Sequence, residues 1–159
     1  MSRVQLALRV GDLDASIAFY ATLFGAEPAK RRPGYANFAV TEPPLKLVLL
    51  AGEPGQDTTP DHLGVEVESS EQVHAATERL AALGLSTEVQ NDTTCCYAVQ
   101  DKVWVHGPGK EPWEVYVVKA DSAGYGANPD LTAAACCTTA EPATTTAPPA
   151  ALAADRLPA

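Results

Sequence analysis

Two pairs of adjacent cysteines carry the most distinctive chemistry in this chain. Cys95-Cys96 and Cys136-Cys137 account for all four of its cysteines. Neighbouring α-carbons lie about 3.8 Å apart, closer than the roughly 4.4–6.8 Å of a relaxed disulfide, so neither pair is expected to be a structural disulfide. Two thiolates on one strand or turn can instead grip a single soft atom. Two inert buried thiols that are neighbours by chance are the alternative interpretation.

The composition excludes several classes of protein. The chain has 159 residues, is 46% hydrophobic and carries a formal net charge of −9. An acidic chain without a basic patch is not expected to bind nucleic acid. The sequence has no secretory segment and no run near the roughly 18 apolar residues of a membrane helix, so we expect a cytoplasmic protein with free thiols.

The composition changes sharply near Lys119. Residues 120–159 are rich in Ala, Thr and Pro and contain almost no large apolar side chain. Such a segment cannot bury enough apolar surface to offset the entropy lost on ordering. The sequence therefore predicts one domain over residues 1–119 and a disordered tail over 120–159.

The domain repeats one pattern of elements. Strand-like alternation at Gln5–Val10 and His62–Val67 is followed each time by a capping residue and a helical stretch. We expect helices at Ala15–Phe24, capped by Asp12 or Asp14, and at Val73–Leu83, capped within Ser69–Glu71, closed by Gly25 and Gly84. Short strands complete each copy: Glu27–Arg31, Tyr35–Val40 and Lys46–Leu50, then Ser86–Gln90, Cys96–Val99 extending toward Val105, and Glu114–Val118.

Two βαβββ modules, over about residues 3–51 and 60–118, predict an α+β fold. Neither module can bury both faces of its own sheet, so we expect them to pack into an eight-stranded half-barrel with a cleft inside and helices outside. The chain resembles the vicinal oxygen chelate superfamily, which includes glyoxalase I, extradiol dioxygenases and the fosfomycin- and bleomycin-resistance proteins. The segments Leu8–Tyr20 and Asp61–Val65 carry this resemblance.

The resemblance implies a metal site. Ligands in this superfamily lie on the first and last strand of each module, and those positions hold Gln5, Lys46, His62 and Glu114. A protonated lysine is a poor ligand, which leaves the amide, the imidazole and the carboxylate. One imidazole and one carboxylate with open positions suit a redox-active divalent ion such as Fe(II).

Within the superfamily the chain looks most like the Fe(II)-dependent carbon–arsenic lyases and the related cadmium-induced proteins. The segments Asn91–His106 and Pro108–Val115 carry this likeness, and glutamine in the first metal position agrees with it. It implies a dioxygenase in which Cys95 and Cys96 bind a trivalent methyl or aromatic arsenical. Iron at Gln5, His62 and Glu114 and dioxygen would then release arsenite.

Other residues have weaker assignments. Tyr97 and Trp104 would shape the organic pocket or simply pack, and Lys102 would lie in a loop after Tyr97, closing the cleft or, more simply, solvated. His74 is expected in solvent, and His106 and the Cys136-Cys137 pair have no assigned role. A homodimer is allowed by the fold, and the preference between methyl and aryl arsenicals and the source of reducing equivalents are left open. A glyoxalase-like or thiol-transferase metalloenzyme and a non-catalytic cadmium- or arsenic-binding protein are the alternative functions.

Overall fold

The computed structural model describes residues 2–126. These residues form eight strands and two helices in the order β1 (Arg3–Val10), α1 (Leu13–Phe24), β2 (Lys30–Arg32), β3 (Tyr35–Val40), β4 (Leu45–Ala51), β5 (Thr59–Glu66), α2 (Ser70–Ala82), β6 (Glu88–Cys95), β7 (Ala98–His106) and β8 (Pro112–Asp121). The predicted α+β fold with a duplicated βαβββ pattern is confirmed.

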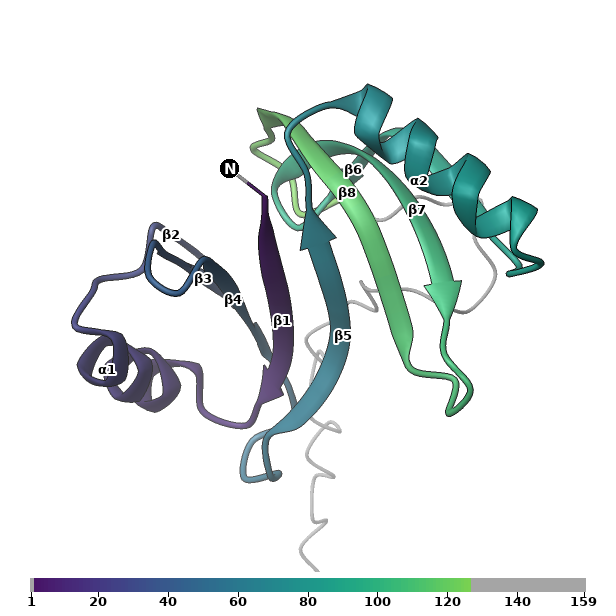
Figure 1. Ribbon diagram of the computed structural model, residues 1–159. Helices are drawn as coiled ribbons and strands as arrows, with labels where there is room; N and C mark the ends of the chain where they lie inside the picture. Colours follow the sequence, from purple (N-terminus) through teal and green to yellow (C-terminus); the bar gives the residue numbers. More distant parts are fainter. Residues whose placement is uncertain (1, 127–159) are drawn as a thin grey trace, which may run out of the picture.

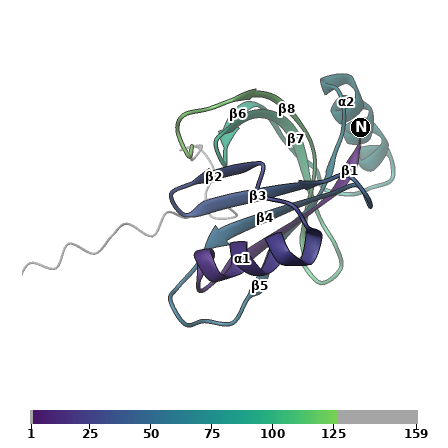
Figure 2. The ribbon, with the colours of Figure 1, turned by 90° about the vertical axis from the view of Figure 1, so that its left-hand side faces the viewer.

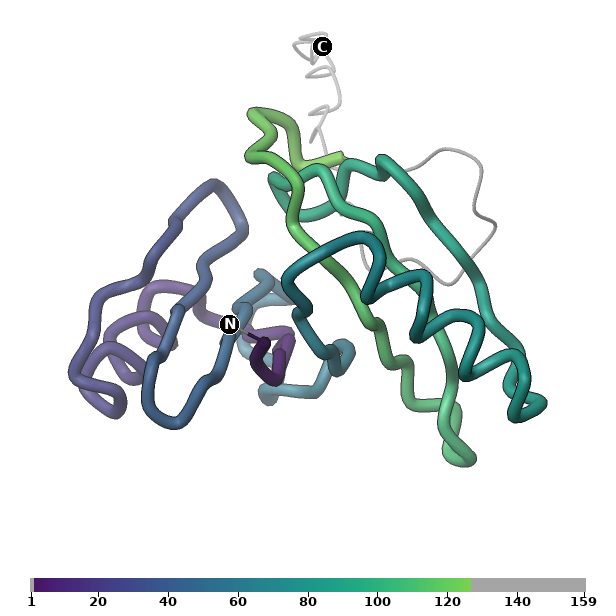
Figure 3. The backbone as a smooth tube through the Cα atoms, turned by 45° about the horizontal axis from the view of Figure 1, so that its top comes forward, coloured from purple at the N-terminus to yellow at the C-terminus, as the bar shows by residue number. Residues whose placement is uncertain are grey.

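All eight strands belong to one mixed sheet. Its order is β2-β3-β4-β1-β5-β8-β7-β6, so the last strand of each module lies beside the first strand of the same module. The pairs β1–β4 and β5–β8 are parallel, and the two modules join through the antiparallel pair β1–β5. Figure 1 and Figure 3 show the two modules on either side of this central junction.

The sheet curves into an open half-barrel with the helices outside (Figure 2). Strand side chains alternate between its two faces. On the outer face, Leu47 and Leu49 of β4 pack in the core cluster beneath α1, and Val103 and Val117 pack with Val73 of α2. The inner face is therefore left to the alternate positions, which include the polar side chains of the site.

Both helices begin earlier than predicted, α1 at Leu13 in place of Ala15 and α2 at Ser70 in place of Val73. The Asp12 carboxylate accepts the Ala15 backbone N–H at 2.9 Å, and Ser69 caps α2 in the same way. Gly25 closes α1 in the left-handed region at φ 61°, where a side chain would be strained. Of the predicted alternatives, Asp12 or Asp14 and Ser69–Glu71, the structure has Asp12 and Ser69 as the caps.

The strand boundaries of the second module differ from the predicted ones. The sequence predicted strands at Ser86–Gln90 and from Cys96 onward. Between them, Asn91 and Asp92 are residue types that favour turns. They lie instead inside β6, at a shift in register between Gln90 and Thr93, where Asp92 has a φ of 50°. A β-bulge inserts such residues without ending the strand, so β6 continues to Cys95 and β7 begins at Ala98.

Strand β8 runs to Asp121, beyond the predicted domain end at Lys119, and Tyr125 packs edge-on against Tyr97 with ring centroids 5.3 Å apart. The remainder of the predicted tail, including Cys136 and Cys137, lies outside the described residues. Within the described part of the chain, no helix is long and apolar enough to span a membrane.

Candidate metal and thiol site

The four central strands bring the predicted metal positions together. Gln5 on β1 lies opposite Lys46 on β4 and opposite Gly64 on β5, and Gly64 in turn lies opposite Glu114 on β8. His62 lies two residues before Gly64, on the same face of β5. The polar groups therefore meet at the junction of the two modules.

His62 is held in one orientation by the residue that precedes it. Its Nδ1 lies 2.7 Å from Asp61 Oδ1, and Arg9 Nε donates to the other Asp61 oxygen at 3.1 Å. This arrangement fixes the ring and turns Nε2 toward Gln5 and Glu114. Burial alone would lower the pKa of His62, but its hydrogen bonds to Asp61 and Glu114 raise the pKa to about 9.

Glu114 is buried and charged. Burial would raise the pKa of its carboxyl, but the attraction of Lys102 and the hydrogen bond to His62 lower it to about 2. The Lys102 ammonium donates to Glu114 Oε2 at 2.7 Å, while Oε1 faces His62 Nε2 at 3.4 Å. One carboxylate oxygen is therefore engaged by lysine, and the other is directed at the imidazole.

The Gln5 amide completes the cluster. Its Nε2 donates to Glu114 Oε1 at 2.6 Å and lies 3.1 Å from His62 Nε2. Two donors bound at about 2.1 Å to one ion, at tetrahedral or octahedral angles, lie about 3.0–3.5 Å apart. The imidazole nitrogen and the carboxylate oxygen meet this requirement at 3.4 Å, so these two groups are spaced to share a cation.

Gly64 leaves the space that this cluster occupies. A Cβ at this position would meet Glu114 Cγ at 3.1 Å and both Cβ and Nε2 of Gln5 at 3.3 Å. Most side-chain contacts are looser than this, so any other residue would press the carboxylate and the amide apart. Glycine at this position therefore lets the Glu114 and Gln5 side chains lie close together.

Lys46 holds the fourth position at which the superfamily carries a metal ligand, and its side chain forms an ion pair with Glu66. Its Nζ lies 3.1 Å from Glu66 Oε2 and 4.9 Å from the centre of the Tyr116 ring. Burial lowers the pKa of Lys46, although Glu66 acts in the opposite direction. The Lys46 ammonium is thus engaged by the Glu66 carboxylate.

Among the described residues, no three side chains of the His, Cys, Asp or Glu types gather as a cation site. The candidate set has only two of these, His62 and Glu114, with the Gln5 amide as the third group. It is therefore a weaker and less charged set than the common arrangement of two histidines and one carboxylate.

The paired thiols lie on a tight turn. Cys95 ends β6 and pairs with Ala98 of β7, so Cys96 and Tyr97 alone connect the two strands. These two residues have φ values of 51° and 63°, the left-handed conformation of a two-residue hairpin turn that usually carries Asn-Gly. A non-glycine pair held in this conformation marks a constrained position and often a functional one.

The two sulfur atoms are 3.4 Å apart and form no disulfide. Two thiolates about 2.3 Å from one soft ion, at angles of about 90–110°, lie about 3.3–3.8 Å apart. Their present separation thus suits binding of a single soft atom. The sequence predicted a strand from Cys96 onward, whereas Cys95 ends β6 and Cys96 lies in the turn before β7.

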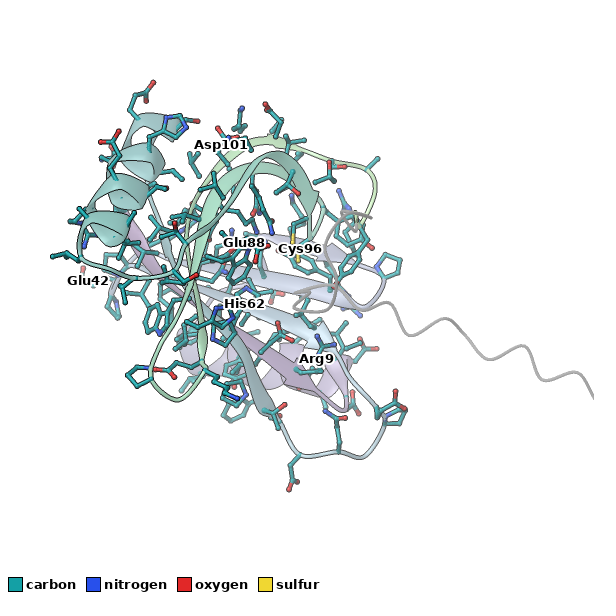
Figure 4. The ribbon with its side chains drawn as sticks, turned by 90° about the vertical axis from the view of Figure 1, so that its right-hand side faces the viewer. Arg9, Glu42, His62, Glu88, Cys96 and Asp101 are labelled. Atoms are coloured by element: carbon teal, nitrogen blue, oxygen red, sulfur yellow. The ribbon has the colours of Figure 1, made fainter. Side chains whose placement is uncertain are left out.

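One pocket contains both groups. Its walls come from the two modules and consist of Gln5, Tyr35, Lys46, Val48, His62, Cys95, Cys96, Gln100, Lys102 and Glu114. Figure 4 shows His62 and Cys96 on the inner side of the curved sheet. A ligand held by the sulfur atoms would therefore face the metal position across the same pocket.

Lys102 is in a different place from the predicted one. It lies on β7, only 1% exposed, so the loop position and the solvated side chain were wrong. Its alternation with Val103 and Val105 was the available signal, because Val103 packs under α2 and Lys102 must then face inward. The charge is tolerated there because Glu114 pairs with it.

Tyr97 and Trp104 are both buried in packing contacts. Tyr97 packs on Tyr35 with ring centroids 5.6 Å apart and donates its hydroxyl to the Pro33 carbonyl at 3.1 Å, which ties the thiol turn to the first module. Trp104 stands edge-on to His62 at 5.6 Å. His74 is exposed as predicted, and His106 lies exposed at the end of β7.

The sequence analysis missed three residues of this site. Asp61 orients His62, while Tyr116 and Glu66 contact Gln5 and Lys46 from β8 and β5. Tyr116 is fully buried and its hydroxyl lies 2.6 Å from Gln5 Oε1 and 2.8 Å from Glu66 Oε2. Its spacing of two from Glu114 on a strand was the signal that both face the same side.

The pattern of a known family matches residues 3–115, and its description is Glyoxalase/Bleomycin resistance protein/Dioxygenase superfamily. The chain belongs to this superfamily. The superfamily includes metal-dependent enzymes.

The chain is also similar in sequence to two individual proteins. The chain is 70% identical over 122 residues to a trivalent organoarsenical cleaving enzyme of Thermomonospora curvata, covering 77% of this chain and 81% of the relative. It is 61% identical over 143 residues to the cadmium-induced protein CadI of Mycobacterium bovis, covering 86% of this chain and 93% of that protein.

The fold also matches solved structures. An extradiol ring-cleaving dioxygenase from B. fuscum aligns with a TM-score of 0.55 and 22% identity, over 75% of this chain and 33% of the dioxygenase. At 22% identity this similarity shows a shared fold and nothing about the reaction.

Proposed function

We propose that the chain cleaves the carbon–arsenic bond of trivalent organoarsenicals, using Fe(II) and dioxygen, and releases arsenite. One observation carries the proposal: an adjacent thiol pair and a His–Glu–Gln cluster line the same pocket. The 70% identity to an enzyme named for cleaving trivalent organoarsenicals supports it.

In this proposal Cys95 and Cys96 capture the arsenic. A trivalent organoarsenical carries two hydroxyl groups, and each thiol would displace one of them, giving two As–S bonds and two molecules of water. The second bond would form at high effective concentration because the two sulfur atoms are neighbours. The organic group would remain on arsenic, inside the pocket.

Gln5, His62 and Glu114 would hold Fe(II). When bound, Fe(II) supplies the electron transfer with dioxygen that side chains cannot perform. Asp61 holds His62 in the orientation that presents Nε2, and Lys102 engages Glu114 Oε2 so that Oε1 is the oxygen presented to the cation. The protein thus separates the soft sulfur ligands of the substrate from the harder nitrogen and oxygen ligands of iron.

The balance of the reaction distinguishes methyl from aryl substrates. Methylarsonous acid and one dioxygen contain the same atoms as formaldehyde and arsenous acid, so this cleavage needs no external electrons. Conversion of a phenylarsonous acid to phenol and arsenous acid leaves the balance short of two protons and two electrons. An added reductant is therefore required for each aryl turnover and for no methyl turnover.

One experiment tests the proposal against its alternatives. Anaerobic protein loaded with Fe(II) is mixed with methylarsonous acid and then exposed to air, and arsenite and formaldehyde are measured. The proposal requires both products in equal amounts, dependent on Fe(II) and on oxygen. Tight binding of the arsenical without arsenite would favour a cadmium- or arsenic-binding protein, which the name CadI of the second relative would fit.

A glyoxalase-like or thiol-transferase enzyme is the other alternative. Such an enzyme would need a fourth ligand in the position of Lys46. That side chain is paired with Glu66 at 3.1 Å, which disfavours this function. We further propose a reducing, cytoplasmic setting, in which the thiols stay reduced. A homodimer stays a prediction.

A further inference from the structure

The Gln5 amide turns its NH₂ group, and not its oxygen, toward the proposed metal position. Its Nε2 faces Glu114 Oε1 at 2.6 Å and His62 Nε2 at 3.1 Å, while its Oε1 points away and accepts from the Tyr116 hydroxyl at 2.6 Å. An amide NH₂ group offers a cation no lone pair, and the amide oxygen is the ligating atom. Gln5 can therefore bind a metal only after its amide has turned over.

The Tyr116 hydroxyl has two acceptors within reach. Gln5 Oε1 lies 2.6 Å from the oxygen and Glu66 Oε2 lies 2.8 Å from it. A hydroxyl carries one hydrogen and two lone pairs, so it donates to only one of these groups at a time. If the hydroxyl donates to Glu66, its lone pairs can accept a hydrogen bond from the Gln5 NH₂ group.

We infer that Tyr116 is a positioning residue that selects which atom of the Gln5 amide faces the metal. In the arrangement described here the hydroxyl donates to the Gln5 oxygen at 2.6 Å. With a cation bound at this position, the hydroxyl would donate to Glu66 and accept from Gln5 Nε2, which would leave Gln5 Oε1 to bind the cation. The turned amide makes one more hydrogen bond through this hydroxyl than the present one does.

The surroundings allow both arrangements. Gly64 leaves the space beside the amide, since a Cβ there would lie 3.3 Å from Gln5 Nε2. Glu66 is kept ionised and in place by Arg3, which donates to Oε1 at 2.9 Å, and by Lys46, at 3.1 Å from Oε2. A charged acceptor is therefore ready for the Tyr116 hydroxyl when the amide turns.

The inference rests on the proposed function only in taking Gln5, His62 and Glu114 as the metal ligands. Its test uses Fe(II) alone, without arsenical or oxygen. The Fe(II) dissociation constant is measured anaerobically for the full chain, for Tyr116→Phe, for Gln5→Glu, and for the double variant. A glutamate at position 5 offers oxygen at both ends, so no turn of the side chain is needed.

We expect Tyr116→Phe to weaken Fe(II) binding about 10-fold or more with glutamine at position 5, and less than about threefold with glutamate there. Equal losses of Fe(II) affinity with glutamine and with glutamate at position 5 would overturn the inference, because a tyrosine that only supports the fold would affect both proteins alike. No loss with glutamine would overturn it as well. Tyr20→Phe removes a hydroxyl from α1, outside the pocket, and should change neither dissociation constant.

A second variant covers the case in which Tyr116→Phe does not fold. Glu66→Gln removes the charged acceptor and keeps the hydroxyl, which then stays on the Gln5 oxygen. The same pattern is expected: a loss of about 10-fold with glutamine at position 5 and less than about threefold with glutamate. Equal losses here would also reject the inference.

The outcome separates this inference from the proposed function. If the chain binds Fe(II) no more tightly than His62→Ala does, the proposed metal site and the role of Tyr116 both fail. If binding depends on His62 but the losses are equal in the two backgrounds, only the role of Tyr116 fails.

Discussion

Lys102 and Glu114 form an ion pair inside the half-barrel, with Nζ 2.7 Å from Oε2 and side chains only 1% and 3% exposed. The pair joins β7 to β8 and places a positive charge beside the proposed metal position. Because neither group reaches water, each depends on the other for its charged state.

Removal of this lysine charge should be costly. Lys102→Met keeps the length of the side chain but leaves the Glu114 carboxylate without its largest stabilising charge. We expect the free energy of unfolding of the metal-free protein to fall by about 3 kcal/mol or more, measured by urea denaturation at pH 7. Arg31→Met, which breaks the exposed Arg31–Asp14 pair, is the control and should cost less than about 1 kcal/mol. Similar losses in both variants would show that the buried pair contributes no more than a surface pair.

The stability of the metal-free protein should depend on pH through His62. Its pKa is raised to about 9, whereas an unfolded histidine has a pKa of about 6.5. The folded state therefore holds the proton more tightly, and this stabilisation is fully present below about pH 6.5 and is lost as the pH rises through 9. We expect the free energy of unfolding to decline across this interval, and the decline to be smaller in His62→Gln. A stability that is flat from pH 6.5 to 9 would contradict the raised pKa of His62.

The thiol pair should be needed for catalysis and not for iron. Cys95→Ser or Cys96→Ser leaves one sulfur, which cannot close the second bond to arsenic, so we expect arsenite release to fall at least about 100-fold. Fe(II) affinity should change less than about twofold, because His62, Glu114 and Gln5 are untouched. The double variant Cys136→Ser/Cys137→Ser is the matched control, since it removes the other adjacent pair. Full activity in Cys95→Ser would rule out binding of arsenic by both thiols.

The fold could be predicted from the sequence much more completely than the site. Alternation of apolar residues and the capping residues Asp12 and Ser69 are local signals, and they placed the strands and helices of both modules. Those signals failed at Asp92, where a turn-forming residue lies in a bulge because the neighbouring strand continues the pairing. The residues around Asp92 do not by themselves indicate that β7 will pair with this segment.

The site needs more than local signals, because it is assembled from strands far apart in the chain. The resemblance to a family provided Gln5, His62 and Glu114, whereas the inward orientation of Lys102 follows from the alternation along β7. The contact between Tyr116 and Glu66 joins β8 to β5 across 50 positions. No spacing within either strand predicts that contact or the orientation of the Gln5 amide.

A side chain at Gly64 should damage the metal position. The Cβ of Gly64→Ala would lie 3.1 Å from Glu114 Cγ and 3.3 Å from Gln5 Cβ, so both neighbours must move by a few tenths of an ångström. We expect the unfolding free energy to fall by about 1–3 kcal/mol and Fe(II) affinity to fall about 10-fold. Gly124→Ala, where an added Cβ meets only Ser122 at 3.9 Å, should change neither quantity. Unaltered Fe(II) binding in Gly64→Ala would mean that the ligands do not need this space.

Tyr97 should act on the thiol turn through its ring. Asparagine tolerates the positive φ of 63° at this position but lacks the ring that packs on Tyr35 and Tyr125. In Tyr97→Asn the turn therefore keeps its backbone conformation and loses its attachment to the first module. We expect affinity for phenylarsonous acid to fall about 10-fold, measured anaerobically by titration, with Fe(II) affinity unchanged. Tyr97→Phe removes only the hydrogen bond to Pro33 and should lose less than about threefold. If both variants bound the arsenical as tightly as the unaltered chain, the docking of the turn by Tyr97 would have no part in holding the thiols in place.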